Sequence, residues 1–199
     1  MYTISKTTVK AGDIFAAQDG SMLICGSCLE VQWPTAEIIY TDPPWNDGIL
    51  RTFYKYAERS NAPTFEMLIS KAVDKMKACN PRYIFIEMGT KNTEMVAELM
   101  HDRGLLFRAK NVLMYGRTKF SILCFGKEDI RLPDTISAEV TRNVIMKRLN
   151  PKSVLDPFAG VGKMLKAAPK TTAVFGIEII PDKFQRMLGN LKYRNLVKQ

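Results

Sequence analysis

The amino-acid sequence predicts an α/β domain with a mostly parallel β-sheet. Short apolar runs, of the length of buried strands, alternate with segments whose apolar residues recur every three or four positions, as on a helix face. The chain has 199 residues, of which 46% are hydrophobic and 25% charged, as in ordinary globular domains. We therefore expect a single domain over residues 1–199, with a core large enough to fold.

The expected elements follow one another along the chain. Strands are predicted over 22–25, 37–41, 82–87, 154–156 and 172–178. Helices are predicted from Thr64 to about 76 and over 92–103, 137–149, 163–168 and 181–196, with Ser137 as a cap, Gly104 as a stop and Pro181 as a start. Residues 46–61 are predicted to form a loop. The runs 107–115 and 119–125 are separated by three residues, which indicates an antiparallel hairpin.

The balance of charge is basic. Lys and Arg number 29 against 20 Asp and Glu, giving a formal charge of +9. This excess favours a polyanionic partner such as nucleic acid, although a basic enzyme without one is the alternative. Residues 1–18 lack the apolar core of a signal peptide, and no apolar run reaches the ~20 residues of a membrane helix. We expect a cytoplasmic chain with no membrane partner.

The four cysteines predict no metal site. Cys25 and Cys28 form one CxxC pair, and Cys79 and Cys124 stand alone. A structural zinc ion takes about four ligands, and no second pair follows the first. The single histidine, His101, falls in a different predicted element.

A glycine-rich turn indicates a nucleoside-cofactor site. Asp156-Pro157-Phe158-Ala159-Gly160-Val161-Gly162 follows the strand over 154–156, and Glu178 ends the next strand. Glycines at such a turn let the backbone approach a ligand, and an acidic residue about 20 positions later suits a ribose hydroxyl. A phosphate-binding Walker A loop is disfavoured, because Pro157 and Met164 stand where glycine and a hydroxyl are needed. A tight turn followed by a surface glutamate is the alternative.

A second motif, Asp42-Pro43-Pro44-Trp45, follows the strand over 37–41. The exocyclic nitrogen of adenine is a weak nucleophile because its lone pair is delocalised into the ring. The Asp42 carboxylate and the Pro43 carbonyl could accept its two N–H bonds and localise that lone pair. The prolines hold these acceptors in place, and Trp45 offers a face for base stacking. A proline-rich strand exit with a packed Trp is the alternative.

The two motifs together resemble those of the N6-adenine and N4-cytosine DNA methyltransferases. Asp42–Trp45 is similar to their catalytic motif, Val154–Gly162 to their cofactor motif, and Gly176-Ile177-Glu178 to the acidic motif after it. The catalytic motif comes first, which is the permuted β-type order. The resemblance covers about residues 20–190. It implies a single Rossmann-like methyltransferase domain with a seven-stranded, mostly parallel sheet containing one reversed hairpin strand.

The resemblance also implies the cofactor and the roles of residues. S-adenosylmethionine would be bound by Asp156, Phe158, Gly160 and Gly162 at its methionine end and by Glu178 at its ribose. Asp42, Pro43, Pro44 and Trp45 would hold the target base. Asp rather than Ser in first place favours adenine over cytosine. The family's usual adenine contact would fall at Ser27 and Cys28, where this chain has Ser27 in place of Asp.

Two further departures concern the cofactor and the substrate. The helix over 137–149 lacks the Lys-Pro usual before the cofactor motif, which leaves the methionine carboxylate contacts open. The interval 46–155 is filled by predicted core elements, so no separate target-recognition domain is expected. Such an enzyme would have loose specificity, would read only a few bases through its loops, or would depend on a second subunit, as a homodimer or with a specificity partner. The expected setting is a phage, a mobile element or a restriction–modification system.

Residues 46–61 are the expected nucleic-acid contact, because basic and aromatic residues interleave there. The candidates are Arg51, Tyr54, Lys55 and Arg59, and a solvated loop with a few packed aromatic residues is the alternative. The helix over 181–196 and the residues after it also carry basic residues, and this run is either a solvated face or a phosphate contact. DNA is the expected substrate. N4-cytosine methylation, RNA adenine methylation, methylation of a glutamine amide and a non-catalytic binding subunit are the alternatives.

Overall fold

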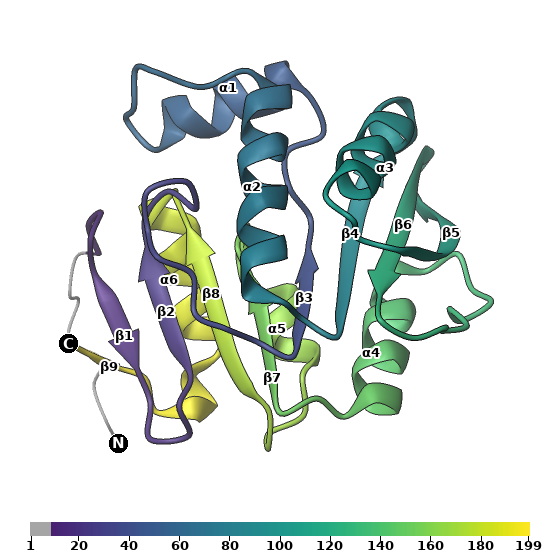
Figure 1. The fold of residues 1–199 in the computed structure, drawn as a ribbon. Coiled ribbons are helices and arrows are strands. Elements are labelled where there is room, and N and C mark those ends of the chain that lie inside the picture. Colours follow the sequence, from purple (N-terminus) through teal and green to yellow (C-terminus); the bar gives the residue numbers. More distant parts are fainter. Residues whose placement is uncertain (1–8) are drawn as a thin grey trace.

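A computed structural model, which describes residues 9–199, shows one twisted β-sheet with helices on both faces (Figure 1). The sheet has nine strands in the order β5-β6-β4-β3-β7-β8-β2-β1-β9. Their bounds are β1 Ile14–Ala16, β2 Met22–Cys25, β3 Ile38–Thr41, β4 Tyr83–Gly89, β5 Phe107–Tyr115, β6 Thr118–Gly126, β7 Ser153–Asp156, β8 Ala173–Glu178 and β9 Val197–Lys198.

The predicted sheet needs one correction. Strands β2, β8, β7, β3 and β4 are parallel, β6 is antiparallel to β4, and β5 completes the predicted hairpin with β6. These seven strands match the expected sheet with one reversed strand. The sheet has nine strands rather than seven because β1 pairs antiparallel with β2, and β9 pairs antiparallel with β1. Both added strands are too short, at 3 and 2 residues, to show a period in the sequence.

The helices form two layers. One layer covers one face of the sheet with α1 Asp47–Tyr56, α2 Phe65–Cys79 and α3 Thr93–Asp102. The other layer contains α4 Ala138–Leu149, α5 Lys163–Ala167 and α6 Pro181–Asn190. Each layer closes its own cluster of buried apolar side chains against the sheet, and strand side chains alternate between the two clusters.

Local signals set several helix ends as expected. The Thr64 and Ser137 hydroxyls accept the Met67 and Val140 amides at 3.2 and 3.4 Å, which caps α2 and α4. The last helix, α6, ends at Asn190 instead of near residue 196 and is followed by a short 3-10 turn, Lys192–Arg194. No helix within residues 9–199 is both long enough and apolar enough to cross a membrane.

The prediction of a loop over residues 46–61 was wrong for residues 47–56. Residues 47–56 form α1, which lies above the carboxyl ends of the central strands (Figure 1). Asn46 caps it by accepting the Ile49 amide at 3.0 Å, and Leu50 and Tyr54 are buried on one face. The signals for this helix were the Asn cap and the spacing of four between two apolar residues.

Candidate active site

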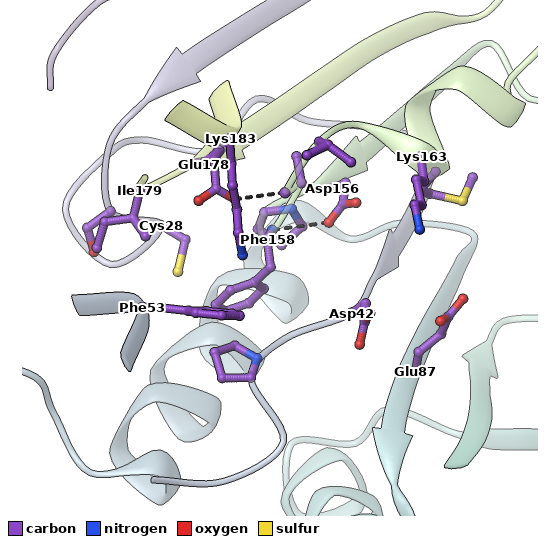
Figure 2. Close-up of a pocket in the computed structure, with 18 of the residues that line it drawn as sticks. Cys28, Asp42, Phe53, Glu87, Asp156, Phe158, Lys163, Glu178, Ile179 and Lys183 are labelled. Carbon is purple, nitrogen blue, oxygen red and sulfur yellow. Dashed lines mark hydrogen bonds between the residues drawn. The ribbon is translucent and has the colours of Figure 1, made fainter. Parts of the chain in front are cut away.

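A cavity of about 300 Å³ opens at the carboxyl ends of the central parallel strands. Asp156 ends β7, Glu178 ends β8, and Asp42 follows β3 directly. The register places these strand ends side by side, and Figure 2 shows the three carboxylates around one pocket. The carboxyl edge of a parallel sheet is where ligands bind in open α/β folds.

One end of the pocket combines a buried carboxylate with an apolar wall. Glu178 is 6% exposed, and its two oxygens accept the Gly160 and Ile180 amides at 2.7 and 2.8 Å. Desolvation by burial raises the pKa of Glu178 although these amides oppose the change. Ile179 lies beside it, and Phe53 lines the same pocket beyond the Lys183 side chain (Figure 2). This end therefore offers hydrogen-bond acceptors next to surfaces that suit a flat ring.

Asp156 joins the two motifs. One of its oxygens accepts the Thr41 hydroxyl at 2.9 Å and the Phe158 amide at 3.1 Å. Thr41 precedes Asp42, so this bond couples the strand of one motif to the turn of the other. Burial raises the pKa of Asp156 to about 7. The turn is thereby held against β3 before any ligand binds.

Asp42 faces the open pocket and is braced by Trp45. The indole Nε1–H donates to the Asp42 carboxylate at 2.8 Å. Desolvation within the pocket, followed by repulsion from Glu87, raises the pKa of Asp42 to about 7. Asp42 is nevertheless exposed to solvent.

The Trp45 indole is fixed by packing. It stacks on Phe120 of β6 with ring centroids 5.4 Å apart and 26° between planes. Gly89 leaves room for the indole, since a Cβ there would lie 3.1 Å from it. Asn92 donates to the Trp45 carbonyl at 2.6 Å. The predicted stacking of this ring on a target base stays a prediction, whereas in the structure the ring stacks on Phe120 and orients Asp42.

A second charged cluster borders Asp42. The Glu87 carboxylate, almost fully buried, accepts the Tyr40 hydroxyl at 2.9 Å and the Arg142 guanidinium at 3.0 and 3.3 Å. Desolvation raises the pKa of Glu87, and the Arg142 charge opposes this. Lys163 extends toward the same group in Figure 2. At the end of the predicted strand over 82–87, Glu87 could be expected either to border the site or to be a polar strand terminus, and it lines the pocket. No spacing in the sequence pointed to Arg142, which is 55 residues away.

The predicted site residues divide into two sets. The pocket is lined by Ser27, Cys28, Asp42, Pro44, Tyr54, Asp156, Phe158, Gly160 and Glu178. The residues outside its lining are Pro43, Trp45, Gly162, Arg51, Lys55 and Arg59.

Several residues of both sets have other contacts. Gly162 has φ of 77°, and a Cβ there would lie 2.8 Å from Met187, so its place is explained by the turn and its packing. Tyr54, expected at the nucleic acid, is 7% exposed and forms part of the pocket wall. Arg59 is paired with Glu30, and the Arg51 Nε–H donates to the Asp47 carbonyl at 3.3 Å.

The C-terminal basic run and the cysteines also have defined places. Lys183 lines the pocket, with its Nζ 3.7 Å from the centre of the Phe53 ring. Arg194 is buried and donates to Asp19 at 2.8 Å, so it is a structural anchor and not a solvated charge. Burial raises the pKa of the Cys25 thiol to about 11 and that of Cys28 to about 12, so both are neutral. Within residues 9–199, no three His, Cys, Asp or Glu side chains gather as a metal site.

Comparisons with known proteins place the fold. No protein-family model and no curated protein matches the sequence. The structure is similar to that of M1.HpyAVI, with 17% identity, a TM-score of 0.59, and coverage of 85% of this chain and 98% of that chain. It is also similar to TTHA0409 of Thermus thermophilus, provisionally described as a DNA modification methylase and solved with S-adenosyl-L-methionine, with 14% identity, a TM-score of 0.65, and coverage of 86% and 95%. The chain therefore has the Rossmann-like α/β fold of these two structures.

Proposed function

We propose that this protein transfers a methyl group from S-adenosylmethionine to the exocyclic amino group of a base in DNA, with N6 of adenine as the target. One observation supports this most strongly: the carboxylates of both sequence motifs, Asp42 and Asp156, lie in one pocket together with Glu178. Structures similar in fold include M1.HpyAVI and TTHA0409, each also solved with the same cofactor.

The pocket suits the charge and shape of this cofactor. Four carboxylates line it, from Asp42, Glu87, Asp156 and Glu178, against the cations of Arg142, Lys163 and Lys183. A ligand that carries a sulfonium cation and ribose hydroxyls would meet negative charge for the first and hydrogen-bond acceptors for the second. Each Glu178 oxygen holds one amide donor and keeps a lone pair for a hydroxyl.

The chain supplies orientation and charge for the reaction. S-adenosylmethionine, when bound, supplies an electrophilic methyl group on sulfur. Asp42 and the Pro43 carbonyl would accept the two N–H bonds of the amino group and direct its lone pair toward that methyl. In such a transfer the amino nitrogen would bond to the methyl carbon as the C–S bond broke, would become cationic and would release one proton. Ionised Asp42, with its pKa at about 7, is suited to stabilise that charge and to take the proton.

The preference for adenine rests on Asp42 as the first motif residue. Cytosine N4 presents a similar amino group, so the same acceptors would serve it. A target base in a duplex must leave the stack to reach the pocket, which costs a few kcal/mol. Identification of the methylated nucleoside decides between the two bases.

The test is methylation of unmethylated duplex DNA with labelled S-adenosylmethionine, followed by digestion and mass spectrometry. We expect N6-methyladenine. Asp42→Ala should lower turnover at least about 100-fold, as loss of a transition-state acceptor does, with little loss of cofactor affinity by calorimetry. Asp102→Ala, at an exposed carboxylate outside the pocket, is the matched control.

A second variant tests the cofactor end. Glu178→Gln removes one charge and should weaken cofactor binding about 10- to 100-fold, as loss of a charged hydrogen bond of about 1.5–3 kcal/mol does.

N4-methylcytosine as product would overturn the choice of adenine, and methylation of RNA but not DNA would overturn the choice of DNA as the substrate. Normal turnover by Asp42→Ala, or no cofactor binding by the unaltered protein, would overturn the proposed chemistry.

A further inference from the structure

We infer that the tip of the β5–β6 hairpin is a contact surface for the DNA backbone beside the pocket, and that it contributes DNA binding that a separate recognition domain would otherwise supply. The surface consists of Tyr115, Arg117, Lys119 and the neighbouring Lys91. The inference rests on the proposed function, because it places the DNA relative to the same pocket.

The hairpin extends past the pocket edge of the sheet. Glu87, which lines the pocket, pairs with Ile122 of β6, and the last residue of β4, Gly89, pairs with Phe120. Residues 115–119 therefore lie beyond the end of β4. At about 3.3 Å per residue, Thr118 lies about 13 Å past the level of Glu87. Figure 1 shows the tip at the same end of the molecule as α1.

The tip is also close to the pocket laterally. Strand β6 is two positions from β3 in the sheet, which corresponds to about 10 Å. One strand of DNA advances about 3.4 Å per nucleotide along the helix axis. A backbone whose base enters the pocket at Asp42 would thus pass the hairpin tip within a few nucleotides.

The charge and exposure of the tip fit a polyanion. The hairpin over residues 107–126 contains four basic residues and no acidic residue. Arg117, Lys119 and Lys91 are exposed, and within residues 9–199 Arg117 and Lys119 have no side-chain hydrogen bond or ion pair. Tyr115 is 74% exposed, which is high for an aromatic ring and suits packing on a sugar or base.

The hairpin is joined directly to the catalytic motif. Phe120, one residue from Lys119, stacks on Trp45, and Trp45 donates to Asp42. Asn92, next to Lys91, donates to the Trp45 carbonyl. A phosphate bound at the tip would therefore lie at a fixed position relative to the Asp42 carboxylate. Arg51 and Lys55 of α1, the contacts predicted from the sequence, are also exposed.

The test measures DNA binding separately from methylation. Anisotropy of a labelled duplex of about 20 base pairs is recorded from about 50 to 300 mM salt for the unaltered protein and for Arg117→Ala/Lys119→Ala. Loss of two phosphate contacts should reduce the slope of log K against log salt by about 1.8, and the affinity at about 100 mM salt by up to about 60-fold. The cofactor Kd should not change.

The matched control is Lys152→Ala/Lys170→Ala, which removes the same charge at the opposite end of the strands. Lys152 precedes β7 and Lys170 precedes β8, and both are exposed. This control should keep the salt slope. Tyr115→Ala should weaken binding without changing the slope, and Tyr115→Phe should retain the affinity.

The outcomes separate the two proposals. If the unaltered protein methylates DNA and the hairpin variant binds DNA with the slope of the control, the inference is overturned while the proposed function stands. A hairpin variant that instead changes oligomeric state by sedimentation would assign the tip to a second copy of the chain, which also overturns it. If the unaltered protein neither binds nor methylates DNA, both proposals fail.

Discussion

Replacing Trp45 by Phe tests how the catalytic carboxylate is tuned. The substitution removes the Nε1–H that donates to Asp42 at 2.8 Å, while a six-membered ring remains to stack on Phe120. The indole hydrogen bond lowers the pKa of Asp42 against the desolvation that raises it to about 7. Without that bond the ionised form loses a donor, so the pKa rises.

The magnitude follows from the position of the bond. A hydrogen bond to a charged group contributes about 1.5–3 kcal/mol when buried, and this one is open to solvent, so about 0.7–1.4 kcal/mol is the appropriate range. Since about 1.36 kcal/mol corresponds to a tenfold change, the pKa of Asp42 should rise by about 0.5 to 1. At pH 7 the ionised fraction should then fall about two- to fivefold, whereas at pH 9 it should barely change.

The assay is kcat/KM for DNA between pH 5.5 and 9. Because ionised Asp42 is the active form, activity should rise with pH through about 7 in the unaltered protein, and this acid limb should move to higher pH in Trp45→Phe. Phe120→Leu is the control, since it removes the stacking partner and leaves the donor. An unchanged acid limb in Trp45→Phe, or a uniform loss of activity at every pH, would refute the assigned role of the indole.

Two further predictions concern the charged pair and the glycine turn. Arg142→Met leaves the Glu87 carboxylate, with 3% side-chain exposure, without its cation, and should lower the free energy of unfolding by about 3 kcal/mol at pH 8. Glu87 already has a raised pKa, so it gains a proton in the variant as the pH falls, and urea unfolding at pH 5 should show a smaller loss. The double variant Glu87→Gln/Arg142→Met should recover most of the free energy of unfolding that Arg142→Met loses. If Arg142→Met lost the same free energy of unfolding at pH 5 and pH 8, this account would be contradicted. Gly160→Ala and Gly162→Ala both place a Cβ at positive φ, but only the second meets Met187. In thermal unfolding, Gly162→Ala should therefore be less stable than Gly160→Ala by about 1–3 kcal/mol. In calorimetry, Gly160→Ala should bind the cofactor more weakly than Gly162→Ala. If Gly162→Ala were instead the more stable variant and the weaker binder, Gly162 would lie at the ligand.

Some of the candidate site could be predicted because its residues lie at strand ends. Asp42, Asp156 and Glu178 each end or directly follow an apolar run, and parallel strands bring such ends to one edge of a sheet. The same periodicity located the hairpin and the helices α3, α4 and α5 to within two residues. Local burial patterns and caps act over a few residues, so the sequence displays them directly.

Other features depend on residues that are distant in the chain. Glu87 accepts a hydrogen bond from Arg142, 55 residues away, and Trp45 stacks on Phe120 of a different element. No spacing along the sequence therefore predicts either contact. The short edge strands β1 and β9 depend on the partners that they pair with, because neither carries a period of its own. The sequence by itself determined the order of elements, the two motifs and the edge on which they meet. Only the tertiary structure decided which side chains orient Asp42 and which basic surface stands beside it, because those contacts arise from packing between elements and not from local conformational preference.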